Sequence, residues 1–110
     1  MYLPNGELAT VSLPKLRDYC LNPDHPHGKH KARVFASVLG FTAEDAAELR
    51  RILLVAARTQ EVQIAAQDEF GQRYLLDVKL AGVREYVLVR SVWIVRPSEG
   101  IPHLVTCYVR

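Results

Sequence analysis

Apolar residues in the first half of the chain recur every three or four positions, the spacing of helices that bury one face. Three helices are predicted, over residues 13–21, 34–39 and 42–57. The first is ended by Asn22 and Pro23, because a residue before proline avoids the helical conformation. The helical half of the chain therefore ends close to residue 60.

After Glu61 the apolar period changes from helical to two, as in β-strands. Four strands are predicted, the first starting near residue 62 and the others covering 74–80, 86–95 and 103–109. The chain is therefore predicted to form a single α+β domain, residues 1–110, with about three N-terminal helices followed by a four-stranded antiparallel β-meander.

Composition favours a globular domain whose positive charge is unevenly distributed. Hydrophobic residues make up 49% and charged residues 24% of the chain, and the net charge is +2. The segment from residue 15 to residue 33 contains five basic and two acidic side chains, an excess of three positive charges. A local patch of this kind can attract an anion even on a nearly neutral protein.

The two cysteines, Cys20 and Cys107, lie in apolar runs and have neither a CxxC neighbour nor a metal-ligand spacing. Buried free thiols in a reducing cytoplasm are expected, and a disulfide from the first helix to the last strand stays the alternative. The start of the chain lacks the features of a secretory signal, and no apolar run has the length of a membrane span. We therefore expect a cytoplasmic protein with no membrane association.

The segment 22–35 contains three of the four histidines, His25, His27 and His30, among turn-forming residues. A metal site is not expected, since no HExxH pattern or cysteine pair completes a ligand set. Two interpretations remain open. The histidines are either solvated loop residues without a role, or acid–base groups acting on a phosphodiester.

The phosphodiester hypothesis draws on both halves of the chain. Lysine and arginine can stabilise the extra negative charge that develops on an attacked phosphate without a metal. Arg90 interrupts an apolar strand, with a salt bridge to Asp77 as the structural alternative, and Trp93 is either a core residue or a platform for a base. Thr106 and Tyr108 are expected to share a strand face with Leu104. The predicted catalytic residues are His25, His30, Lys31, Arg90, Thr106 and Tyr108, and the predicted substrate-binding residues are Lys29, Arg33 and Trp93.

The runs 16–26, 31–35, 70–74, 89–95 and 104–108 together resemble a bacterial domain family of unknown function. Such domains look like the toxin tips of some phage-type and polymorphic toxins. Their order of helices followed by a four-stranded meander is similar to the barnase–EndoU–colicin–RelE group of ribonuclease toxins. By that resemblance, His25 and Lys31 from the loop would act with Arg90, Thr106 and Tyr108 from the sheet.

The resemblance implies a metal-independent endoribonuclease of the bacterial toxin type. It would require no cofactor, act on RNA and bind a small antitoxin or immunity protein. The alternative is a non-catalytic interaction module that binds a small neighbour-encoded partner through its basic loop.

Overall fold

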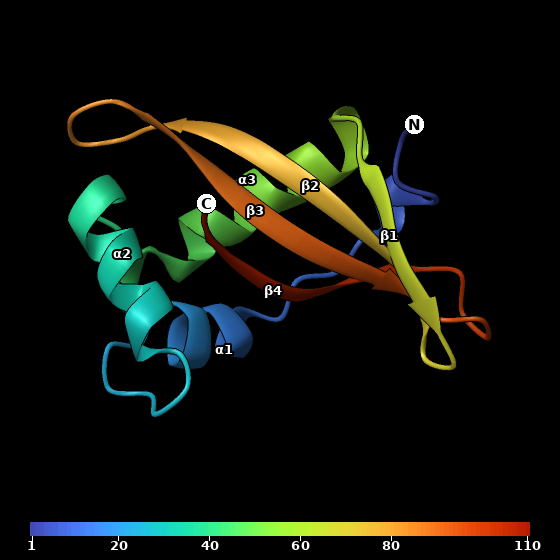
Figure 1. Ribbon diagram of the computed structural model, residues 1–110, viewed down its shortest axis with the longest axis horizontal. Helices are drawn as coiled ribbons and strands as arrows, with labels where there is room; N and C mark the ends of the chain where they lie inside the picture. Colours follow the sequence, from blue (N-terminus) through green and yellow to red (C-terminus); the bar gives the residue numbers. More distant parts are fainter.

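A computed structural model describes all residues, 1–110, and confirms the α+β architecture, with the helices first and the strands last (Figure 1). The helical half holds short turns η1 (Gly6–Leu8), α1 (Leu13–Lys15), η2 (Leu16–Cys20) and η3 (Ala43–Asp45), and the longer helices α2 (Lys29–Leu39) and α3 (Ala46–Thr59). The strands are β1 (Gln63–Asp68), β2 (Gly71–Ala81), β3 (Tyr86–Val95) and β4 (Pro102–Val109).

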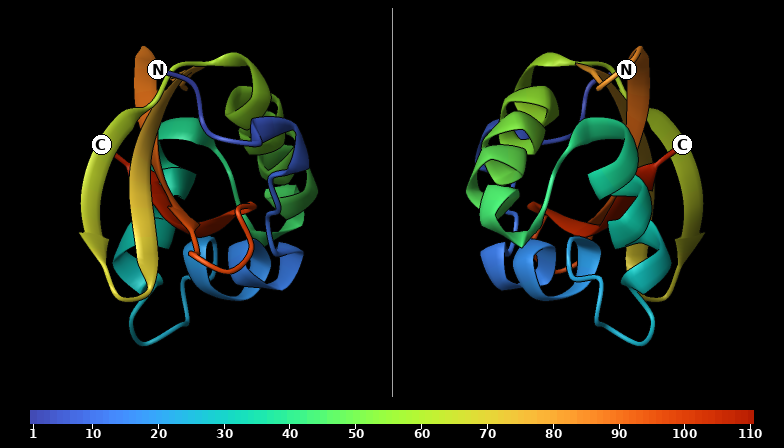
Figure 2. Two further views of the ribbon diagram at one scale, coloured as in Figure 1. Left: turned by 90° about the vertical axis from the view of Figure 1, so that its right-hand side faces the viewer. Right: turned by 90° about the vertical axis from the view of Figure 1, so that its left-hand side faces the viewer.

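The strands form one antiparallel sheet in the order β1-β2-β3-β4, as expected for a meander. Helix α3 covers one face of this sheet, and no helix lies on the opposite face (Figures 1 and 2). The segment α1–η2 and helix α2 lie toward the β4 edge, where they contact that strand. No helix has both the length and the apolar character needed to cross a membrane.

The core lies between the sheet and the helices and is built by the apolar periodicities of both. Phe35 from α2, Leu49 and Leu53 from α3, and Trp93 from β3 are completely buried in it. One polar side chain, Ser91, is also completely buried. Its Oγ donates to the Leu76 carbonyl oxygen at 2.8 Å and accepts the indole N–H of Trp93 at 2.8 Å.

Several element boundaries differ from the prediction. Helix α2 begins at Lys29, five residues before the apolar stripe that revealed it, so Lys29, His30, Lys31 and Arg33 are helical. The first helix changes at Leu16 from α-helical to the wider π-helical winding, which single sequences do not signal.

The last strand carries a β-bulge at Val105 that the alternation pattern did not reveal. Val92 pairs with Thr106 whereas Trp93 pairs with Leu104, which leaves Val105 as the extra residue. The prediction that Thr106 and Tyr108 share a face with Leu104 is therefore wrong. Leu104 is buried beside Trp93, and Tyr108 is paired with Arg90 instead.

We expect Ser91→Ala to lower the free energy of unfolding by about 1–3 kcal/mol, because it leaves two buried polar groups without their partner. Urea unfolding followed by Trp93 fluorescence would measure this loss. Ser98→Ala, at an exposed loop position, is the control and should have no effect. Equal stability of the two variants would contradict the role assigned to Ser91.

Candidate anion-binding groove at the edge of strand β4

The histidine-rich loop is folded back onto η2 by hydrogen bonds to its own backbone. Asn22 accepts the backbone N–H of Asp24 through Oδ1 at 2.9 Å and donates through Nδ2 to the Asp18 carbonyl oxygen at 3.1 Å. Gly28 packs so closely that a β-carbon there would lie 2.3 Å from the Tyr19 carbonyl oxygen. The loop therefore places the start of α2 directly against η2.

His25 orders the last part of this loop, just before α2 begins at Lys29. Its Nδ1 accepts the backbone N–H groups of His27 at 3.0 Å and Gly28 at 3.1 Å. Its ring meets the Tyr19 ring edge-on, with centroids 4.7 Å apart. Because Nδ1 is an acceptor, the ring proton is on Nε2, and only that nitrogen remains for other contacts.

Lys31 lies at the centre of the predicted residues. Its Nζ donates to Thr106 Oγ1 at 3.2 Å and lies 5.5 Å from the ring centroid of Tyr19 and 5.4 Å from that of Tyr108. These distances are within the range of cation–π attraction. No carboxylate lies within ion-pair distance of this ammonium, so its charge is not neutralised.

A second lysine, Lys15, reaches the same edge of β4 from α1. Its Nζ donates to the carbonyl oxygen of Val105 at 3.1 Å and lies 3.5 Å from that of Leu104. Like Lys31, Lys15 has no carboxylate partner. Two unpaired ammonium groups thus follow one another along β4.

Two hollows that share Lys31 form what we call the lysine groove. One, of about 500 Å³, is lined by Lys15, Tyr19, Lys31, Val105 and Thr106. The other, of about 270 Å³, is lined by His30, Lys31, Val34, Tyr108 and Val109. Cations, hydroxyls and aromatic rings in one open groove suit an anion that carries flat rings.

A family model described as "Domain of unknown function (DUF6883)" matches residues 2–110. The chain is a DUF6883 domain. Searches of curated proteins and of solved structures found no match.

In this DUF6883 domain, Arg90 lies beside the groove, but its charge is shared. Its Nε and Nη2 donate to the two carboxylate oxygens of Asp77 at 2.9 and 3.1 Å, and Arg110 also donates to Asp77 at 2.8 Å. The hydrogen bond from Arg90 lowers the pKa of Asp77, and the same bond raises the pKa of Arg90. The salt bridge weighed from the sequence is therefore present, and Tyr108 pairs with Arg90 across the strands.

The remaining predicted residues are dispersed. Trp93 is completely buried and its indole N–H is bonded to Ser91, so no base can stack on it in this fold. Of its two predicted roles, the structure shows the core one. Arg33 is exposed and lines a different hollow, of about 400 Å³, with Pro23 and Thr42. Lys29 is half-buried and lines neither hollow of the groove.

The three loop histidines do not converge as metal ligands. No group of three or more histidine, cysteine, aspartate or glutamate side chains is arranged to hold an ion. His25 and His27 have ring centroids 5.9 Å apart, and His30 instead lines the lysine groove. His30 is thus the loop histidine that lines a hollow together with Lys31.

Sequence analysis missed Lys15 and Tyr19 as groove residues. Both lie in the short first helix, and their spacing of four residues places them on one helical face. That spacing was the available signal.

Both cysteines lie beneath the groove as fully buried free thiols, in agreement with the prediction. Cys20 follows Tyr19, and Cys107 stands between Thr106 and Tyr108. The hydrogen bond between the two thiols lowers the pKa of Cys20, and the same bond together with burial raises that of Cys107. Lys31 also favours a thiolate at Cys20 through its positive charge.

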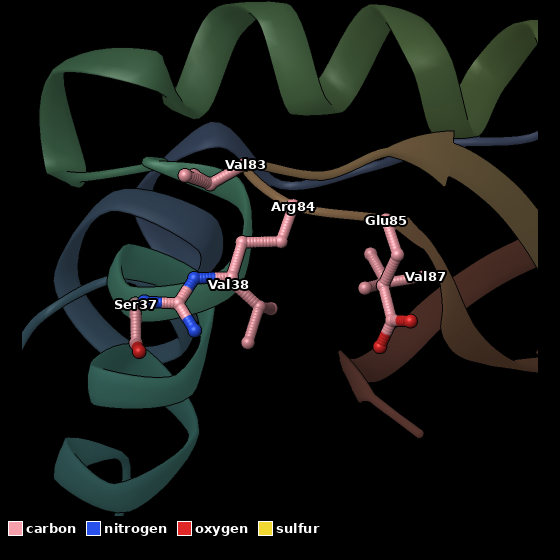
Figure 3. A pocket seen from close by; sticks show the side chains of 6 residues that line it. All are labelled: Ser37, Val38, Val83, Arg84, Glu85 and Val87. Carbon is pink, nitrogen blue, oxygen red and sulfur yellow. The ribbon is translucent and has the colours of Figure 1, made fainter.

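Another hollow, of about 430 Å³, lies between the end of α2 and the β2–β3 turn (Figure 3). Arg84 extends toward Ser37 on one side of it, whereas the Glu85 carboxylate points away (Figure 3). No predicted site residue lines it, and its lining includes both a cationic and an anionic side chain. Its lining is Ser37, Val38, Val83, Arg84, Glu85 and Val87.

We expect His25→Ala to lower the free energy of unfolding by about 1 kcal/mol, because two backbone N–H groups of the loop lose their side-chain acceptor. His25→Asn should recover part of that stability, because its side-chain oxygen can accept the same backbone N–H groups. Urea unfolding would measure both changes, with His27→Ala as the control. A His25→Ala variant as stable as the control would contradict the role of His25 in ordering the loop.

We expect Asp77→Asn to destabilise the domain at pH 7 and to do so less in acid. The folded-state pKa of Asp77 is lowered, so the carboxylate contributes stability above the unfolded value of about 3.9 and loses it as pH falls through the lower folded value. Urea midpoints of wild type and variant between pH 7 and pH 3 should therefore converge. Asp24→Asn, in the exposed loop, is the control, and a constant difference across this range would contradict the expectation.

Proposed function

We propose that this domain is a metal-independent endoribonuclease that binds the scissile phosphate of RNA in the lysine groove. The observation that carries the proposal is the environment of Lys31. Its unpaired ammonium is held by the Thr106 hydroxyl between two tyrosine rings, and His30 lines the same groove. This set offers a cation for a phosphate and an imidazole that can accept or donate a proton.

The reaction would use the substrate's own 2′-hydroxyl. His30, as general base, would take its proton while the 2′-oxygen forms a bond to phosphorus. The bond from phosphorus to the 5′-oxygen would break, and that oxygen would take a proton from Tyr108 or water. The products would be a 2′,3′-cyclic phosphate and a 5′-hydroxyl, and Lys31 would stabilise the extra negative charge during the exchange.

The other predicted residues take supporting roles in this proposal. His25 orders the loop and supports the Tyr19 ring, so it is a positioning residue. Thr106 holds the Lys31 ammonium in place. Arg90 is paired with Asp77 and stands opposite Tyr108, beside which it maintains a positive charge.

The order of the helices and strands supports the proposal that this ribonuclease is of the toxin type. A group of helices followed by a four-stranded antiparallel meander resembles the barnase–EndoU–colicin–RelE toxins, which cleave RNA without metal. Under the same proposal, a small antitoxin or immunity protein would block the groove. An acidic surface on that partner would complement the unpaired lysines.

A second candidate is a non-catalytic interaction module. It is favoured by the apolar side chains that stay exposed around the β2–β3 turn, Val83, Tyr86 and Leu88. Exposed apolar side chains that lie close together are typical of binding surfaces. This candidate predicts a stable complex with a partner, no RNA cleavage, and loss of the complex on Tyr86→Ser.

We expect the purified domain to cleave RNA in the presence of EDTA. His30→Ala and Lys31→Ala should each reduce the rate about 100-fold or more, as the loss of an acid–base group or of a transition-state cation does. Gel analysis of a labelled single-stranded RNA, with detection of the cyclic phosphate end, would measure this.

Two control variants match the chemistry removed. His27→Ala deletes an exposed imidazole of the same loop, and Lys79→Ala deletes an ammonium that also lies on a tyrosine ring, 4.7 Å from the Tyr86 centroid. Both should cleave at the wild-type rate. Cleavage retained by His30→Ala and Lys31→Ala would remove the groove from the mechanism.

A further inference from the structure

The two lysines of the groove are anchored to consecutive positions of one strand. Lys15 donates to the Val105 carbonyl oxygen, and Lys31 donates to the hydroxyl of the next residue, Thr106. The bulge at Val105 lies between the paired residues Leu104 and Thr106. The two ammonium groups are therefore anchored one after the other along β4.

Neither ammonium group of the groove is paired with a carboxylate. Six arginines of the domain are within 4.0 Å of a carboxylate, but neither groove lysine is. A lysine has three N–H donors, and Lys31 uses one of them on Thr106. A row of two unpaired cations matches a ligand with successive negative charges at regular spacing.

Aromatic rings lie on both sides of Lys31. Tyr19 lines the larger hollow with Lys15, and Tyr108 lines the smaller hollow with His30. Both rings are partly exposed, and the edge-on contact with His25 holds the Tyr19 ring in place. Tyrosine rings are platforms for nucleobases that are not already stacked in a duplex.

We propose that the lysine groove binds single-stranded RNA through two adjoining nucleotide sites. Lys31 holds the central phosphate, Lys15 holds a neighbouring phosphate, and bases lie against Tyr19 on one side and Tyr108 on the other. This inference rests on the proposed function, because it places the cleaved phosphate at Lys31. It adds Lys15 and Tyr19 as substrate-binding residues and excludes duplex RNA as the preferred ligand.

The test is binding of a fluorescent 2′-O-methyl hexanucleotide, which cannot undergo the cyclisation step, measured by anisotropy at several salt concentrations. For single strands, each phosphate contact contributes about 0.7 to the slope of log K against log salt. Lys15→Gln and Lys31→Gln should each lower that slope by about 0.7. Lys79→Gln, the matched control, should leave it unchanged.

The aromatic part is tested with a conservative pair of variants. Tyr19→Leu should weaken hexanucleotide binding roughly five- to 150-fold, the range expected for the loss of one stacked base, and Tyr19→Phe should bind as wild type. Circular dichroism would show that Tyr19→Leu is folded. Annealing the probe to its complement should weaken binding.

Failure of this inference and failure of the proposed function give different results. Unchanged salt slopes in Lys15→Gln, with RNA cleavage intact, would overturn the two-site groove alone. Lysine-dependent hexanucleotide binding without cleavage of unmodified RNA would support the groove and overturn the nuclease. A polyglutamate peptide that binds through Lys15 and Lys31 while the hexanucleotide does not bind would overturn both in favour of an acidic protein partner.

Discussion

The edge of strand β4 is the constraint on which this arrangement depends. An edge strand presents backbone groups that need partners, and a fold must cover them or leave them to water. Here the N-terminal segment covers the first part, since Thr10 exchanges backbone hydrogen bonds with Pro102 and Leu104 at 3.0 Å each. Farther along the strand, the Lys15 ammonium group donates to the carbonyl oxygens of Leu104 and Val105. Covering this edge with an ammonium group instead of a strand leaves a positive charge where the sheet ends.

The basic side chains of the molecule fall into two groups that differ in their hydrogen-bond partners. On the open face of the sheet, arginines are matched with carboxylates, as in the pairs Arg90–Asp77 and Arg73–Asp68. At the β4 edge, Lys15 and Lys31 are bound to neutral oxygens. Neutral partners fix the position of an ammonium without cancelling its charge. The helical half of the domain thus supplies the charge, and the sheet supplies the hydroxyls and part of the aromatic surface.

The sequence was sufficient to predict the elements whose apolar residues recur at a regular spacing. Helical and alternating periods located α3, β2 and β3 because those elements bury one side over many residues. Lys31 could be found because it lies three residues before an apolar stripe, in a basic segment. By contrast, the Val105 bulge has no pattern of its own, and its effect on Thr106 and Tyr108 depends on pairing with β3. The engagement of His25 Nδ1 and the reach of Lys15 are tertiary contacts, and periodicity carries no information about them.

The bulge has a consequence for how the groove can vary among related chains. Along β4 the side chains of Thr106, Cys107 and Tyr108 point alternately to the groove and to the core. Whether a residue stands at an odd or an even position along the strand therefore decides whether its side chain reaches the groove. An insertion or deletion on either side of Val105 would exchange the two sets, turning a thiol outward and forcing a hydroxyl and a phenol into the interior. The chemistry of the groove therefore depends on the number of residues in β4, and related chains that keep this chemistry have to keep that number.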